Sequence, residues 1–303
     1  MPISINDRLI RACRHTYDIN PDGSLPGNPD ADAIGYQVPL SVFVSGLDKI
    51  DGATVGQTDS EIIVAFRGTF PPTAPDHLQM ILDWVSDFDD VLIDKTPGLP
   101  GKVHQGFSNA LDALWPGMVP AIGTLVGQNP GKPLYVTGHS KGGAVANLAA
   151  MLLKPTLPAT TAMSVVTFAA PRAGDQDFAN AYANAIAQSD RYEYADDLVP
   201  HVPPSDAFVD VLQGAPDVFN QAPELAAWLQ GLHIGYVSVG DLHFINWSGE
   251  IQGDSALLRL ERLSSLVKLM VKGLTGFSTI AEDHSIGVDS GYYNGILSLP
   301  GGV

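Results

Sequence analysis

The chain has 303 residues, of which 45% are apolar and only 16% are charged. Its 16 basic and 33 acidic residues give a formal net charge of −17 at pH 7. This balance argues against binding to nucleic acid and against attraction to anionic membranes, because both need a basic surface. The single cysteine, Cys13, excludes an intramolecular disulfide and a multi-thiolate metal site. We therefore expect a soluble protein that acts on a neutral substrate.

The N-terminal residues do not resemble a secretory signal, because they lack a seven-residue apolar core and carry Asp7 early. No run of about 18 apolar residues is present, so no transmembrane helix is expected. These features predict a protein that is either cytoplasmic or exported without a cleavable N-terminal signal. They do not indicate an oligomeric state.

The first predicted element is an amphipathic helix over residues 6–18, in which Cys13 packs as a small hydrophobe. A loop rich in turn formers follows over residues 19–32. Three residues at the start of this loop, Asp18, Asn20 and Asp22, form half of a calcium-loop pattern. Pro29 stands where that pattern needs glutamate, so a surface turn is the favoured interpretation and a calcium site the alternative.

Predicted strands and helices alternate from residue 61 to residue 195. Short apolar runs predict buried strands, and apolar residues at helical spacing predict helices. The strands are expected at 61–67, 134–137, 164–169 and 191–195, and the helices at 107–126 (broken by proline after Trp115), 141–153 and 175–187. This alternation predicts an α/β fold with a mostly parallel central sheet and helices on both faces.

The pattern changes after Pro200. Residues 205–232 are irregular to helical and are interpreted as a variable insertion. Residues 235–239 and 242–247 predict a hairpin with Gly240-Asp241 as its turn, and residues 255–275 predict a long amphipathic helix. Because no repeat or low-complexity linker divides the chain, we expect residues 1–303 to form a single domain.

The segment Gly138-His139-Ser140-Lys141-Gly142 fits the pattern G-x-S-x-G between a predicted strand and a predicted helix. A nucleophilic serine needs this context, because it must sit at the tip of a sharp strand-to-helix turn. Side chains two residues before and after the serine would collide there, so both positions need glycine. We therefore predict Ser140 as a nucleophile and the backbone N–H of Lys141 as one donor of an oxyanion hole.

Five further motifs accompany this turn in a fixed order along the chain. They are Ile62–Thr69, Asp83-Trp84-x-x-Asp87, Val103–Phe107, Thr167–Gly174 and Asp197–Pro204. Together with Ser140 and His284, the set resembles the class 3 lipases, the fungal and bacterial triacylglycerol lipase family. The resemblance covers roughly residues 60–290. It implies the α/β-hydrolase fold and ester hydrolysis that needs no metal and no organic cofactor.

In this fold the acid and then the histidine follow the serine along the chain. Asp196 and Asp197 both follow the predicted strand 191–195, and the resemblance assigns Asp197 as the acid. The resemblance also assigns His284 as the general base and Thr69 as the second oxyanion donor.

The other seven histidines are less favoured as the base. His139 is expected to point away from Ser140, and the resemblance implies a structural role for His104. His201 follows Asp197 too closely to fold back easily. His233 and His243 flank the predicted hairpin and are expected to be structural, with either one as the alternative base. His77 lies in the predicted lid, and His15 comes too early in the chain.

Residues 70–83 are predicted to form a lid over the pocket. Three prolines make the first part of this segment stiff and extended. The apolar residues Leu78, Met80, Ile81 and Leu82 follow on a short helical segment. A surface helix this apolar is expected to cover a binding site; a fixed wall of an open pocket is the alternative. Lys141 stands where the family most often has leucine, and we expect it to pair with Asp83 or Asp87 or, alternatively, to be solvated.

The favoured function is that of a triacylglycerol lipase, a serine carboxylic ester hydrolase that acts through an acyl-enzyme. Its substrate would be an acyl ester, either in a lipid droplet or in solution. Sibling alternatives are a short-chain or feruloyl esterase and a phospholipase A1, and a serine peptidase is a more distant one. A catalytically silent binding module of the same fold is the alternative from another class.

Overall fold

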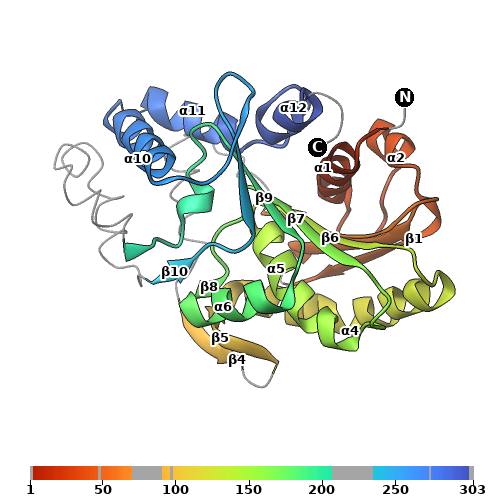
Figure 1. Cartoon of the computed structure of the whole chain (residues 1–303). Coiled ribbons are helices and arrows are strands. Elements are labelled where there is room, and N and C mark those ends of the chain that lie inside the picture. The colour runs from red at the N-terminus through yellow and green to blue at the C-terminus, as the bar shows by residue number, and fades with distance from the viewer. Residues whose placement is uncertain are drawn as a thin grey trace.

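The computed structural model describes residues 3–46, 49–69, 91–95, 98–206, 235–272 and 274–299. The main sheet has eight strands in the order β1-β2-β3-β6-β7-β9-β11-β12 (Figure 1). Their bounds are β1 Gln37–Ser45, β2 Asp51–Gln57, β3 Ile62–Phe66, β6 Leu134–His139, β7 Met163–Phe168, β9 Ser189–Tyr194, β11 Asp241–Ile245 and β12 Ile251–Gln252.

Neighbouring strands from β3 to β11 are parallel, whereas β1, β2 and β12 pair antiparallel at the two sides of the sheet. A parallel strand that is covered on both faces needs an unbroken apolar run. Strand β3 has the sequence IIVAF, and all five residues are buried. The predicted α/β fold with a mostly parallel central sheet is therefore confirmed.

Helices cover both faces of this sheet (Figure 1). One face packs against α4 (Gln105–Gln128), α5 (Lys141–Leu153) and α6 (Gln176–Ala185), and the other packs against α1 (Ile5–His15) and α12 (Gly291–Leu297). The period of two along β3 divides its side chains between the two cores. Val64 and Phe66 belong to the first core, and Ile63 and Ala65 belong to the second.

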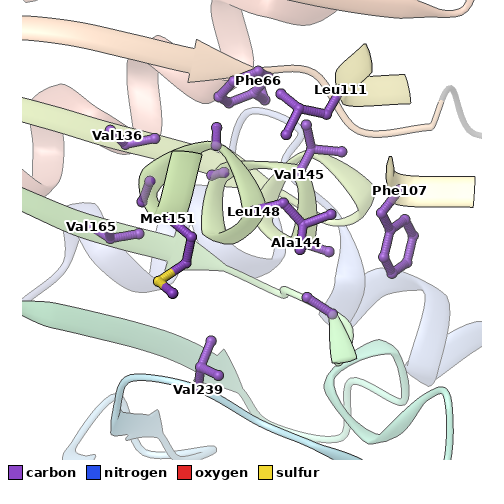
Figure 2. Close-up of a cluster of buried hydrophobic side chains, with 14 of the residues drawn as sticks. Phe66, Phe107, Leu111, Val136, Ala144, Val145, Leu148, Met151, Val165 and Val239 are labelled. Carbon is purple, nitrogen blue, oxygen red and sulfur yellow. The ribbon is translucent and has the colours of Figure 1, made fainter. Parts of the chain in front are cut away.

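Helix α5 lies in the centre of the first core, with eleven of its residues buried. Figure 2 shows its side chains among those of strands β6 and β7 and of helix α4, including Val136, Val165 and Leu111. A helix that is apolar on all sides has to be buried in this way. This packing fixes the N-terminal end of α5, where Lys141 follows Ser140.

A second sheet has four strands in the order β10-β8-β5-β4. These are β10 Tyr236–Val237, β8 Gly174–Asp175, β5 Leu99–His104 and β4 Leu92–Lys95. The hairpin expected over 235–247 is therefore wrong, because β10 pairs with β8 whereas β11 joins the main sheet beside β9. Gly240, at a positive φ of 80°, does mark a turn, but the turn leads from one sheet to the other.

The break expected in the helix 107–126 is also wrong, because α4 runs without interruption from Gln105 to Gln128. Pro116 and Pro120 lie four residues apart on its exposed side. There water can bond the carbonyl groups that lose a helical partner, which makes the prolines tolerable. Within the described residues, α4 is the one helix long and apolar enough to cross a membrane; one of its faces packs in the core.

Two further helices differ from the expected elements. The helix expected at 255–275 is α10 (Ala256–Val271), which ends four residues earlier than expected. A further helix, α11 (Leu274–His284), follows it, and His284 is the last residue of α11 rather than part of a loop. The loop expected at 19–32 ends in a short helix, α2 (Pro29–Ile34), because the side chain of Asn28 caps its first turn and Pro29 stands at the first helical position.

Candidate active site

Ser140 lies between β6 and α5 at φ 57° and ψ −135°, a conformation that costs energy for any residue with a side chain. The two glycines of the motif allow this turn. A Cβ at Gly138 would lie 2.1 Å from the carbonyl oxygen of Gly142, and a Cβ at Gly142 would lie 2.3 Å from the carbonyl oxygen of Phe66. The turn therefore needs glycine at both positions, and it presses against the end of β3.

The structure brings together the three residues to which the sequence assigned the nucleophile, the base and the acid. His284 Nε2 lies 3.0 Å from Ser140 Oγ, and His284 Nδ1 lies 3.0 Å from each carboxylate oxygen of Asp197. All three side chains are buried, and Asp197 is fully so. Ser140 comes from the turn after β6, Asp197 from the turn after β9 and His284 from the end of α11.

Asp197 is held by two further hydrogen bonds. The hydroxyl of Tyr292 donates to Oδ2 at 2.8 Å, and the backbone N–H of Val199 donates to Oδ1 at 2.9 Å. Burial and the charge of Asp197 raise the pKa of Tyr292 well above its usual value, so its hydroxyl stays protonated as a donor. The buried carboxylate is thus satisfied, and its orientation toward His284 is fixed.

His139 packs against the ring of His284 and bonds to its backbone, a role that the sequence did not indicate. Its ring centroid lies 4.9 Å from that of His284, and its Nε2 lies 2.9 Å from the backbone oxygen of His284. Burial and the charge of His284 lower the pKa of His139 well below its usual value, so the ring is neutral. Because a carbonyl can only accept, Nε2 carries the proton, and Nδ1 accepts from the hydroxyl of Tyr17 at 2.8 Å.

The segment after β3 is pressed against the serine turn. A Cβ at Gly68 would lie 2.9 Å from the Cβ of Ser140 and 2.7 Å from the carbonyl oxygen of His139. Thr69 is the next residue. It lines a cavity of about 590 Å³ together with Lys141, and apolar residues of α4, including Phe107 and Ala110, form another wall. Both residues expected to form the oxyanion hole therefore border one cavity.

Lys141 forms an ion pair, but with a partner that the sequence did not indicate. Its Nζ lies 2.7 Å from Oδ1 of Asp51, the first residue of β2. Both side chains are mostly buried. The interpretation of Lys141 as a solvated residue is therefore wrong, whereas the expected pairing with a carboxylate is observed. Asp83 and Asp87 lie outside the described residues.

A second pair of carboxylates lies directly beside the first set. The backbone N–H of Asp196 donates to Oδ2 of Asp283 at 3.0 Å, and the indole N–H of Trp247 donates to Oδ2 of Asp196 at 2.8 Å. Burial and the charges of Asp196, Asp197 and Glu282 raise the pKa of Asp283 to about 7. Asp196 therefore bonds away from His284, and the loop that holds the acid is tied to the end of α11.

The other predicted residues lie elsewhere. Among the six histidines that the structure describes, only His284 bonds to Ser140: His104 caps α4 through the N–H of Phe107, and His15, His201 and His243 have partners away from Ser140. His77, His233, the lid residues Leu78, Met80, Ile81 and Leu82 and most of the insertion 205–232 lie outside the described residues.

The half calcium loop is held by its own side chains. Asp18 accepts from the side-chain amide of Asn28, and Asp22 accepts from the backbone N–H of Ser24 at 2.9 Å. In the part of the chain that the structure describes, no group of three or more histidine, cysteine, aspartate or glutamate residues is placed to hold a metal ion. The favoured interpretation of this loop, a surface turn, agrees with these contacts.

Solved structures show the same fold. A triacylglycerol lipase whose catalytic centre is formed by a serine protease triad superposes with a TM-score of 0.61 at 22% identity, covering 83% of this chain and 85% of that chain. A fungal lipase superposes with a TM-score of 0.62 at 19% identity, covering 91% and 92%. The chain thus has the α/β-hydrolase fold.

Sequence comparisons also find lipases as relatives of this chain. A lipase from Rhizomucor miehei is 31% identical over 157 residues, which cover 50% of this chain and 41% of the relative. A secreted mono- and diacylglycerol lipase A from Penicillium camembertii is 29% identical over 178 residues, covering 58% and 54%. The chain therefore spans about half the length of these curated relatives. Residues 63–207 match the family model of class 3 lipases, which confirms the resemblance that the motifs indicated.

Proposed function

We propose that this chain is a serine carboxylic ester hydrolase of the class 3 lipase type, with acylglycerols as its substrates, and that the whole chain forms one hydrolase domain. The observation that carries the proposal is the line of hydrogen bonds from Ser140 through His284 to Asp197. Each of the three side chains is buried and held by its own element, so the arrangement is already formed without a substrate.

The catalytic cycle uses only groups of the chain. His284 Nε2 takes the proton of the Ser140 hydroxyl while Oγ attacks the ester carbonyl carbon, and Asp197 stabilises the imidazolium that forms. The negative oxygen of the tetrahedral intermediate accepts from the backbone N–H groups of Lys141 and Thr69. His284 then gives its proton to the departing alcohol, and an acyl-enzyme remains. Water, activated by the same histidine, releases the fatty acid.

The cavity bordered by Thr69 and Lys141 supports an apolar acyl group as the substrate. Its volume is about 590 Å³, and α4 contributes Phe107, Ala110 and Ala113 to its wall. Apolar side chains favour an alkyl chain by about 25 cal/mol per Å² of apolar surface removed from water. Acylglycerols, the substrates named for two of the relatives above, carry such chains on an uncharged glycerol ester.

A fluorophosphonate probe tests the nucleophile directly, because it forms a covalent bond only with an activated serine. Labelling of the wild-type chain, with the mass increase confined to the peptide that contains Ser140, is the expected result. The Ser140→Ala variant should not react. Labelling at another serine would refute the assignment, and a wild-type chain without any labelling would favour a catalytically silent module.

The substrate class is tested by hydrolysis rates on p-nitrophenyl esters from acetate to stearate and on emulsified tri-, di- and monoacylglycerols. A preference for medium or long chains together with hydrolysis of an acylglycerol is expected. Activity confined to acetate and butyrate esters would instead indicate a short-chain esterase.

A further inference from the structure

A second cavity, of about 450 Å³, is lined in part by residues that follow Asp197 in the chain. Its walls come from β9, β10, β11, α10 and the residues after Asp197, including Pro200 and His201. Four of the sixteen basic residues of the chain meet there, namely Arg172, Arg191, Arg259 and Arg262, whereas two carboxylates, Glu193 and Asp254, face them. A chain with a net charge of −17 has thus gathered a local excess of positive charge.

The excess of positive charge lies in the inner part of the cavity. Glu193 is shared by two arginines, because Arg191 Nε lies 2.8 Å from its Oε1 and Arg262 NH2 lies 2.5 Å from its Oε2. Arg172 has no carboxylate partner among the described residues and donates instead to the carbonyl oxygens of His201 and Pro203. At the rim, Arg259 and Asp254 neutralise each other. Among the residues that the structure describes, four arginines against two carboxylates leave two positive charges without a counter-charge.

Such an excess is costly, because buried charges need a partner of opposite sign. Arg172, Glu193 and Arg262 are all buried. Burial and the nearby arginines lower the pKa of Arg172 to about 10. His201 adds no compensation, because burial and the charge of Arg262 keep its pKa well below the usual value and the ring neutral.

The donors of the cluster are not fully used either. Nε of Arg262 is buried and has no hydrogen-bond partner in the described part of the chain. The guanidinium carbon of the same residue lies 4.5 Å from the centre of the Phe244 ring, which holds the group flat against one wall. A buried donor without an acceptor costs roughly 1–3 kcal/mol, so a ligand that accepts this bond would be favoured.

We propose that this cavity binds a phosphate group, either as free orthophosphate or a phosphomonoester or as part of a phospholipid headgroup. A phosphomonoester carries about −1.5 to −2 charges and three oxygens that accept hydrogen bonds, which matches an excess of two positive charges and several planar guanidinium groups. The phosphodiester of a lipid headgroup carries a single negative charge and would balance one of the two. The site shares no lining residue with the cavity bordered by Thr69 and Lys141. A bound phosphate would, however, fix the loop over residues 200–203, which follows the proposed acid Asp197.

Binding is measured by isothermal titration calorimetry and by thermal unfolding of the full chain, with inorganic phosphate added at constant ionic strength. Saturable binding and a rise of the melting temperature are expected, whereas sodium chloride and acetate should give neither. Arg172→Gln should weaken phosphate binding at least about tenfold, because it removes one of the two unpaired charges. Arg259→Gln tests the site without a deeply buried substitution and should weaken it less.

Lys95→Gln is the matched control, because it removes one positive charge from an exposed pair with Asp112 at another place in the fold. This variant should bind phosphate like the wild type. The proposal is overturned if phosphate does not bind, if acetate binds equally well, or if Lys95→Gln weakens binding as much as Arg172→Gln does. Tighter binding of glycerophosphocholine than of orthophosphate would support a lipid headgroup as the ligand, and the reverse order would support a free phosphate.

Discussion

Ser140, His284 and Asp197 should act as one unit, because each depends on the next for its proton or its orientation. We expect Ser140→Ala and His284→Ala each to lower kcat by roughly a million-fold, and Asp197→Asn by roughly ten-thousand-fold. The double variant Ser140→Ala/His284→Ala should lose little more than either single change. Steady-state rates on one soluble ester measure this series, with circular dichroism to show that each variant folds. A His284→Ala variant that keeps most of its activity would contradict the assignment of the base.

Asp283 should make stability depend on pH, because its pKa is raised from its ordinary 3.8 to about 7. Between these values the folded chain holds a proton that the unfolded chain releases. Stability should therefore fall as pH rises from about 4 to about 7 and then level off. In Asp283→Asn the amide oxygen still accepts from the N–H of Asp196, but the charge beside Asp196, Asp197 and Glu282 is gone. Its melting temperature should exceed that of the wild type at pH 8 and approach it at pH 4.

The Asp283→Asn comparison needs a control in which a nearby exposed acid, rather than this half-buried one, is removed. Asp289→Asn is suitable, because Asp289 is exposed in the turn before α12. Melting curves of this variant should follow the wild type at every pH. If the curves of wild type and Asp283→Asn run parallel across the whole range, Asp283 does not titrate as described.

The ion pair between Lys141 and Asp51 predicts a stability effect without a large kinetic one. Lys141→Leu leaves the carboxylate of Asp51 mostly buried and unpaired, which should cost roughly 1–3 kcal/mol of unfolding free energy. The backbone N–H that we propose as an oxyanion donor remains, so kcat should change little. Adding Asp51→Asn should restore most of the lost stability, as a double-mutant cycle would show. If the loss in the double variant instead equals the sum of the losses in Lys141→Leu and Asp51→Asn, the pair contributes nothing.

At the scale of elements, the contact between the serine turn and β3 explains why glycine is required at position 142. A Cβ there would lie 2.3 Å from the carbonyl oxygen of Phe66. Because a strand in the centre of a sheet cannot move away, Gly142→Ala should lower stability by about 3 kcal/mol and abolish most activity. Gly123→Ala is the control, since Gly123 lies on the exposed side of α4 and a Cβ there would meet no atom within 4 Å. It should raise stability by about 0.5–1 kcal/mol. Denaturant titrations measure both changes.

The elements that sequence patterns predicted well are those whose signal is local. Strands β3, β6 and β7 and helix α5 appear within two residues of their expected bounds, because an unbroken apolar run or an all-apolar helix is itself the requirement for burial on two faces. The region 235–247 failed for the opposite reason. Its turn was visible in Gly240, but its strands pair with β8 and β9, and no local pattern specifies a partner so distant in the chain.

In the candidate site, too, some residues could be predicted from the sequence and others could not. Ser140 could be found from its own motif, and family motifs led to Asp197 and His284, whose contacts the structure then supplied. The contacts of the residues around these three could not be predicted from the sequence. Lys141 bonds a residue 90 positions away, and His139 bonds one 145 positions away. Charge and size at such positions look ordinary in the sequence, and only the folded arrangement reveals which groups meet.

At the scale of the whole molecule, the net charge of −17 predicts how the protein approaches a lipid surface. A negative protein is repelled by a negative interface over about one Debye length, which is about 30 Å at 0.01 M salt and about 10 Å at 0.1 M. Hydrolysis of triacylglycerol droplets coated with phosphatidylglycerol should therefore rise severalfold between these two salt concentrations. The gain should appear as a lower apparent KM, because salt changes the approach to the surface and leaves the buried chemistry unchanged.

Two comparisons separate this effect from a direct action of salt on the enzyme. Droplets coated with phosphatidylcholine carry no net surface charge, so their hydrolysis should change little with salt. A soluble p-nitrophenyl ester, which has no interface, should show the same independence. If salt raised the rate equally on all three substrates, repulsion could not be the cause, since two of them carry no surface charge to be screened. A gain confined to the anionic droplets would show that the acidic surface limits which interfaces the serine site can reach.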